Sequence, residues 1–106
     1  MKLAAPRAAF LAALALVAGA AQAKVYFVHA RGAAFAPKTV EVRAGDTVEW
    51  KNEDIFPHNI LARDKSFASK KDLEPETKFR WVAKTKGSHP YFCTLHPVMT
   101  GTIVVK

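Results

Sequence analysis

The stretch TVEVRAGDTVEWK, residues 39–51, predicts the fold class of this chain. Apolar and polar residues alternate over 39–43 and again over 47–51, which is the period-two pattern of a half-buried β-strand. Ala44-Gly45-Asp46 between them is a turn signal, and Asn52-Glu53-Asp54 ends the second strand. The stretch is therefore expected to form two strands joined by a short turn.

Further short strands are expected on both sides of this stretch, over residues 24–30, 78–83 and 102–106. A strand is also expected to place His89, Tyr91 and Cys93 on one face. Residues 62–77 are polar and rich in lysine, and we expect loops around short edge strands there. No segment shows the 3.6-residue period of a helix. Many short strands separated by turns are typical of a β-sandwich or barrel, so the fold is expected to be all-β.

The first 23 residues have the pattern of a cleavable signal peptide. Lys2 and Arg7 precede an apolar run of eleven residues, 8–18, and Ala21-Gln22-Ala23 offers the small residues that signal peptidase requires. This run is shorter than the roughly 20 residues of a membrane span, although an uncleaved anchor is the alternative. We expect export to the periplasm with cleavage after Ala23, no stable membrane association, and one domain over 24–106.

The net charge and the single cysteine limit the kinds of function that this chain can have. The 106-residue chain has a net charge of +7, and because two basic residues lie in the leader, residues 24–106 carry +5. A single cysteine excludes an internal disulfide, so in an exported protein it pairs between chains, reacts, or binds a metal. Nucleic-acid binding is not expected, since no groove of interleaved aromatic and basic residues is indicated.

Basic residues are dense in one segment of the chain. A solvated basic face is the ordinary explanation, and steering toward an acidic redox partner is the functional one. The segment contains Arg63, Lys65, Lys70, Lys71, Lys78, Arg80, Lys84 and Lys86.

Cys93, His96 and Met99 follow one another at steps of three, on a loop after a predicted strand. His58, 35 residues before Cys93, is the obvious donor of a fourth ligand. One thiolate, two imidazoles and a weak axial thioether are the ligands of a blue-copper electron-transfer site. Zinc does not usually take methionine, and haem attachment requires a C-x-x-C-H motif that is absent. A cysteine–histidine nucleophilic pair is the remaining alternative.

The other two histidines are expected to be structural or surface residues. His29 lies near a strand end, and His89 is four residues from Cys93, well back along the strand.

Four motifs resemble those of the cupredoxins, and most of all those of the amicyanins, plastocyanins and pseudoazurins. They are Phe35-x-Pro37 with Val40-x-Val42, Gly45-x-x-Val48-x-Trp50-x-Asn52, Pro57-His58-Asn59, and Cys93-x-x-His96-Pro97-x-Met99. The resemblance spans about residues 35–106. It implies a Greek-key β-sandwich with one type 1 copper ion at one end.

Carried over by motif, the copper ligands are His58, Cys93, His96 and Met99. The resemblance further implies that the Asn59 N–H donates to the Cys93 sulfur and that the Asn59 side chain reaches Thr94, because such partners orient metal ligands.

Leu95 replaces a proline that the relatives commonly have beside the ligand histidine. Because leucine has an N–H, we expect Leu95 to donate a second hydrogen bond to the Cys93 sulfur. The alternative is that this N–H points to solvent and that Leu95 only contributes to an apolar patch.

The expected function is periplasmic electron transfer through Cu(II)/Cu(I), and no enzyme activity is expected. Redox partner proteins are expected to dock on an apolar patch of Leu95, Pro97 and Val98 around His96, and the chain to act as a monomer. The alternative is a periplasmic carrier or storage protein that delivers copper.

Overall fold

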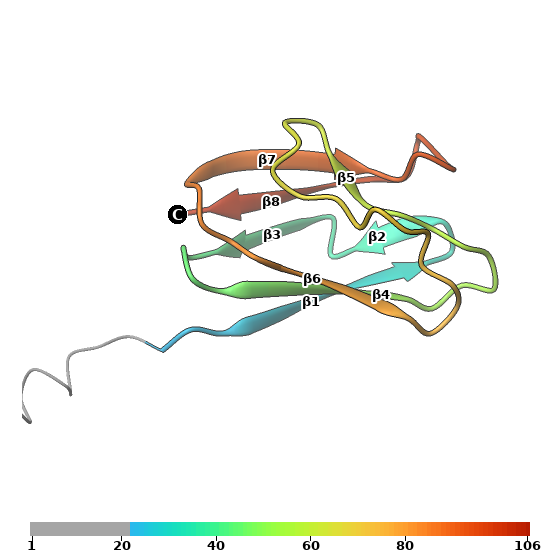
Figure 1. Ribbon diagram of the computed structural model, residues 1–106, viewed down its shortest axis with the longest axis horizontal. Helices are drawn as coiled ribbons and strands as arrows, with labels where there is room; N and C mark the ends of the chain where they lie inside the picture. The colour runs from blue at the N-terminus through green and yellow to red at the C-terminus, as the bar shows by residue number, and fades with distance from the viewer. Residues whose placement is uncertain (1–21) are drawn as a thin grey trace, which may run out of the picture.

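The computed structural model describes residues 22–106, so the predicted signal peptide lies outside the described residues except for Gln22 and Ala23 (Figure 1). The described part contains eight strands and no helix, and hence no helix that could cross a membrane. The strands are β1 (Val25–Arg31), β2 (Ala34–Ala36), β3 (Thr39–Val42), β4 (Thr47–Asn52), β5 (Leu61–Ala62), β6 (Lys78–Val82), β7 (Gly87–Phe92) and β8 (Thr100–Val105).

The strands form two four-stranded sheets that pack face to face (Figure 1). The order is β2-β1-β4-β6 in one sheet and β3-β8-β7-β5 in the other. The β1–β4 and β3–β8 pairs are parallel and the remaining pairs are antiparallel. Most connections pass from one sheet to the other, and the predicted all-β Greek-key sandwich is confirmed.

The turn predicted at 44–46 joins strands of different sheets. The Asp46 carboxylate accepts hydrogen bonds from the backbone N–H groups of Lys24 (2.9 Å) and Arg43 (2.8 Å). These two bonds lower the pKa of Asp46, because they favour its charged form. Gly45 has a φ of 99°, a conformation that favours glycine. The turn therefore directs β4 into the opposite sheet from β3.

Trp50 lies fully buried at the centre of the core. Its ring is 5.4 Å from Phe67, 5.5 Å from Phe79 and 5.4 Å from Tyr91, measured between ring centroids. The polar segment expected to form loops also supplies core residues, since Phe67 and Leu73 are both buried. Packing of these two side chains fixes the segment against the core between the two sheets.

Candidate metal centre

The four candidate ligands come from connections at one end of the sandwich. Figure 1 shows the β4–β5 and β7–β8 connections at the same end, together with the β1–β2 turn. His58 lies between β4 and β5, Cys93 directly follows β7, and Met99 directly precedes β8. His58, Cys93 and Met99 are buried, whereas His96 is half-buried.

His58 presents one ring nitrogen to the thiol of Cys93. The His58 Nδ1 atom lies 3.9 Å from Cys93 Sγ, and its Nε2 atom lies 2.7 Å from Asp54 Oδ2. A carboxylate only accepts hydrogen bonds, so Nε2 carries the proton and donates it. The lone pair of Nδ1 is then free on the side of the sulfur.

The ligand loop is closed by its own backbone. The Cys93 N–H donates to the Met99 carbonyl (3.0 Å), and the Met99 N–H donates to the His96 carbonyl (2.8 Å). The His96 ring lies edge-to-face against His58, with 5.1 Å between ring centroids. These contacts bring His96 beside His58 and bury Met99 at the base of the loop.

The donor set fits a copper ion. With bonds of about 2.0 Å to nitrogen and about 2.3 Å to sulfur, two ligands of one tetrahedral or trigonal metal lie roughly 3.5–3.7 Å apart. The spacing of 3.9 Å between His58 Nδ1 and Cys93 Sγ is close to this value. Thiolate and thioether are soft ligands that suit copper. Within residues 22–106, no three His, Cys, Asp or Glu side chains already converge as a metal cluster.

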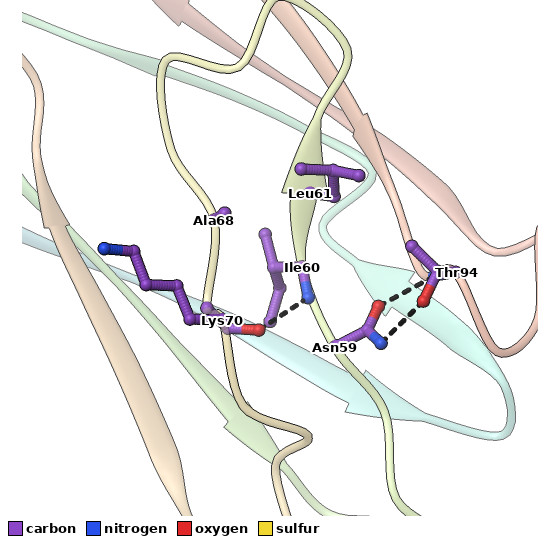
Figure 2. A pocket seen from close by; sticks show the side chains of 7 residues that line it. Asn59, Ile60, Leu61, Ala68, Lys70 and Thr94 are labelled. Atoms are coloured by element: carbon purple, nitrogen blue, oxygen red, sulfur yellow. Dashed lines mark hydrogen bonds between the residues drawn. The ribbon is translucent and has the colours of Figure 1, made fainter.

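Asn59 joins the two ligand loops (Figure 2). Its N–H donates to Cys93 Sγ at 3.3 Å, and its side-chain Oδ1 accepts from the Thr94 N–H at 2.7 Å. Its Nδ2 donates to Thr94 Oγ1 (2.7 Å) and to Asp72 Oδ1 (3.0 Å). The side chain thus holds Thr94, the residue directly after Cys93, in place.

The hydrogen bond expected from Leu95 to the Cys93 sulfur is not formed. Among the described residues, the backbone N–H that donates to Cys93 Sγ is that of Asn59. The Thr94 N–H is turned to Asn59 Oδ1, and Leu95 is 44% exposed. Leu95 therefore belongs to the surface of the loop.

Asp54 is a residue of the site that the sequence analysis did not identify, since it was taken only as a strand end. Besides His58 Nε2, its carboxylate accepts the N–H groups of Gly32 (2.6 Å) and Ala33 (2.9 Å). Burial opposes ionisation of Asp54, but the hydrogen bonds from Ala33, His58 and Gly32 outweigh it and lower its pKa. An acidic residue four positions before the candidate ligand, in the same loop, was the available signal.

The apolar surface around the site is wider than the expected patch. Leu95, Pro97 and Val98 are exposed, and Val98 is 91% exposed. Ile55 (82%) and Phe56 (61%) on the β4–β5 connection are exposed too. We call these five residues the apolar collar. The run Ile-Phe-Pro directly before His58 was the signal for the additional pair.

A shallow pocket of about 180 Å³ lies next to the site (Figure 2). It is lined by Asn59, Ile60, Leu61, Ala68, Ser69, Lys70 and Thr94. None of the four candidate ligands lines it, so this pocket is distinct from the metal centre.

The two remaining histidines have other partners. His29 Nδ1 lies 2.7 Å from Glu53 Oε2, at a partly exposed position. His89 is buried between Asp64 Oδ2 (2.7 Å from Nδ1) and the Thr85 carbonyl (2.8 Å from Nε2). Both have the structural or surface placement expected of them.

Comparison with known proteins gives a consistent set of relatives. Residues 4–105 match the model of the cupredoxin-like domain family. The chain is 33% identical to amicyanin-alpha of Methylorubrum extorquens, covering 97% of this chain and 95% of the relative. It is 37% identical over 78 residues to amicyanin of Paracoccus versutus, covering 63% of this chain, and it spans 54% of that relative's length.

A solved structure of a copper(I) amicyanin variant has the same fold. It superimposes with a TM-score of 0.70 at 26% sequence identity, covering 84% of this chain and 88% of that chain.

Proposed function

Since this chain belongs to the cupredoxin-like family, we propose that it is a periplasmic blue-copper protein that carries single electrons between redox proteins. The observation that carries the proposal is the pairing of His58 Nδ1 with the buried Cys93 sulfur at 3.9 Å. The copper(I) form of an amicyanin relative with the same fold supports the choice of metal. The proposal assigns the chain no enzymatic activity.

The proposed ligands of one type 1 copper ion are His58, Cys93, His96 and Met99. When bound, copper supplies a one-electron couple between Cu(II) and Cu(I). Cys93 contributes the thiolate, the two histidines contribute neutral imidazoles, and Met99 contributes the weak axial thioether. Three of these side chains are buried and their loops are tied by hydrogen bonds, so little of the chain has to move when an electron transfers.

His96 is the proposed electron port. Its ring is half-buried, and it belongs to the loop that carries Leu95, Pro97 and Val98 of the apolar collar. An exposed apolar surface without charged side chains suits brief contact with a redox partner, because it excludes water without creating specific ion pairs. The basic segment at 63–86 is proposed to steer acidic partners, and the chain is proposed to act as a monomer.

The test of the function is spectroscopic. Purified protein loaded with copper is expected to show an intense blue colour and the EPR signal of a type 1 site, and to be reduced and reoxidised without losing metal. A colourless protein that passes copper to a chelator would instead favour copper delivery. Rapid alkylation of Cys93 in the presence of copper would favour a thiol enzyme, since a ligand sulfur is protected.

The docking surface can be tested without a known partner. Val98→Lys is expected to slow electron self-exchange between copies at least several-fold, measured by NMR line broadening, because facing collars would then repel each other. Val82→Lys is the matched control, since Val82 is 46% exposed but pairs with Thr47 at the other end of the sheet. Equal rates in the two variants would remove the collar from the mechanism.

A further inference from the structure

Asp54 connects a candidate copper ligand to a turn that contributes no ligand of its own. Its Oδ2 atom accepts the hydrogen bond of His58 Nε2 at 2.7 Å and that of the Ala33 N–H at 2.9 Å. Its Oδ1 atom accepts the Gly32 N–H at 2.6 Å. Gly32 and Ala33 form the turn between β1 and β2, which Figure 1 places at the same end as the ligand loops.

The turn is shaped to present both amide groups to this carboxylate. Gly32 has a φ of 62° and Ala33 a φ of 55°, and two consecutive residues in this region are uncommon outside tight turns. The Asp54 N–H in turn donates to Asn52 Oδ1 at 2.9 Å. Asp54 is thus held from both sides, with its side chain only 15% exposed.

Asn52 fixes the rest of the connection that leads to His58. It is completely buried, and its Nδ2 donates to the carbonyls of Phe56 (2.7 Å) and Leu73 (2.8 Å). Leu73 also exchanges backbone hydrogen bonds with His58. The backbone of His58 is therefore fixed by Leu73, and what remains to be set is the ring.

A histidine ring has two choices that matter for a metal: which nitrogen carries the proton, and which way the ring faces. A carboxylate that accepts a hydrogen bond from Nε2 determines both the tautomer and the ring orientation. It keeps the proton on Nε2 and leaves the Nδ1 lone pair facing Cys93. A charged acceptor also makes the opposite nitrogen a stronger donor to the metal.

We propose that Asp54 is a positioning residue of the metal centre, and that through it the β1–β2 turn acts as a third loop of the site. It sets the tautomer and orientation of the His58 ring before any metal binds. This inference rests on the proposed function only where it concerns copper, since the state of the ring can be observed in metal-free protein. The competing interpretation is that Asp54 only caps the β1–β2 turn.

The first readout is the protonation of the two His58 ring nitrogens in metal-free protein, observed by ¹⁵N NMR at neutral pH. The intact chain is expected to show His58 protonated at Nε2 alone, with a slowly exchanging Nε2 proton. Asp54→Ala is expected to give a mixture of the two tautomers and to lose that slow proton. Asp54→Asn keeps an oxygen that can accept from Nε2, so it is expected to retain the Nε2 tautomer.

The second readout is copper binding and the EPR spectrum of the loaded protein. Asp54→Ala is expected to lower copper affinity about 10- to 100-fold, the usual effect of removing a carboxylate behind a ligand histidine. Asp54→Asn, which loses only the charge, is expected to lie between that variant and the intact protein. The hyperfine splitting of the EPR signal should change in the same order.

Glu53→Gln is the matched control. It removes a negative charge one residue before Asp54. The Glu53 carboxylate is hydrogen-bonded to His29 and Arg31 of β1 but not to His58. This variant is expected to leave the His58 tautomer unchanged and to alter copper affinity less than threefold. If Asp54→Ala and Glu53→Gln gave the same tautomer and affinity, Asp54 would be only a turn cap.

The two proposals fail in different ways. If the intact protein binds no copper but Asp54→Ala still mixes the His58 tautomers, the proposed function is overturned and the positioning role of Asp54 stands. If the intact protein is blue but its His58 tautomer does not depend on Asp54, the positioning role is overturned and the proposed function stands.

Discussion

Tyr91 and Gly101 face each other on β7 and β8, in a cross-strand pair that leaves no room for a side chain at position 101. A Cβ atom at Gly101 would overlap the Tyr91 ring at Cζ, Cε1 and the hydroxyl oxygen. The ring is buried and lies 4.9 Å from Phe35 between centroids. Burial raises the pKa of Tyr91, because the phenolate would be charged in an apolar surrounding.

Gly101→Ala is expected to lower the free energy of unfolding by about 1–3 kcal/mol, because the added methyl group overpacks the core against Tyr91. Denaturant unfolding followed by tryptophan fluorescence measures this effect. In a Tyr91→Leu background the same change should cost less, since the overlapping atoms are absent. An equal cost in both backgrounds would show that the ring is not the cause.

Asn59→Ala is expected to lower the free energy of unfolding by about 0.5–1.5 kcal/mol, because it removes the solvent-exposed hydrogen bond that links Asn59 Oδ1 to the Thr94 N–H. Its backbone N–H to the Cys93 sulfur remains, so copper should still bind, but with a broadened EPR signal as the loop loosens. Thr94→Val removes one of the two acceptors of Asn59 Nδ2, the Thr94 hydroxyl at 2.7 Å, and is expected to have the smaller effect. The reverse order would argue against a linking role for Asn59.

At the scale of elements, the segment between β5 and β6 is secured at two points. Phe67 enters the core between Trp50 and Trp81, with 4.3 Å between the Phe67 and Trp81 centroids. Asp64, in the same segment, contacts His89 on β7. The segment is therefore part of the fold, although its composition is that of a solvated loop.

Both ring nitrogens of His89 face acceptors, the Asp64 carboxylate and the Thr85 carbonyl, so a ring that satisfies both must be protonated on both. Burial by itself would lower the pKa of His89, but the contacts with Thr85 and Asp64 outweigh it and raise the pKa. Hydrogen bonds from Ser66 and His89 lower the pKa of Asp64 to about 2.

The His89–Asp64 pair should make stability depend on pH. A raised histidine pKa contributes stability that is fully present below its ordinary value of 6.5 and is lost as pH rises through the folded value. The lowered pKa of Asp64 contributes stability that is present above 3.8 and is lost as pH falls toward about 2. The pair therefore stabilises the fold most between about pH 4 and 6.5.

The measurement is the difference in unfolding free energy between the intact chain and His89→Gln across pH. This difference is expected to be largest near pH 5 and to shrink above pH 7. His29→Gln is the control for removal of a histidine side chain from the surface, since that ring is 42% exposed. A difference that stays constant from pH 5 to pH 9 would contradict the charged state of His89.

At the scale of the whole molecule, charge is distributed unevenly. Several cations of one sheet are paired, such as Arg80 and Lys78 with Glu49, and Lys51 with Glu76. In the described part of the chain, the cations without an ion pair include Lys65, Lys70, Lys71, Lys84 and Lys86, all in the connections. The net charge of +5 on residues 24–106 therefore lies mainly in the connections between strands.

Electron exchange with small redox complexes should reveal this charge. Oxidation of the copper-loaded protein by anionic ferricyanide is expected to slow as ionic strength rises, because salt screens the attraction. Oxidation by a cationic cobalt complex is expected to speed up over the same range. Stopped-flow absorbance at the blue band measures both rates, and rates that respond alike to salt would exclude steering by the net positive charge.

What the sequence determined by itself was local. Alternation of apolar and polar residues predicted the positions of β3, β4 and β6, because a strand places successive side chains on opposite faces wherever it lies. A run of β-branched residues predicted β8, and β1 was expected as an opening strand. The three-residue spacing of Cys93, His96 and Met99 likewise confines them to one short loop. The shared face of His89, Tyr91 and Cys93 followed from the same period, and all three are buried.

What only the tertiary structure decided was which distant groups meet. The sheet assignment of each strand, the parallel β1–β4 and β3–β8 pairs and the core position of Phe67 depend on packing between remote segments. Asp54 was missed, and Leu95 was given a hydrogen bond that does not form, for the same reason. The direction of a carboxylate or an N–H in a loop depends on partners some 20 to 35 residues away, such as Gly32 for Asp54 and Asn59 for Thr94, and no local periodicity encodes those contacts.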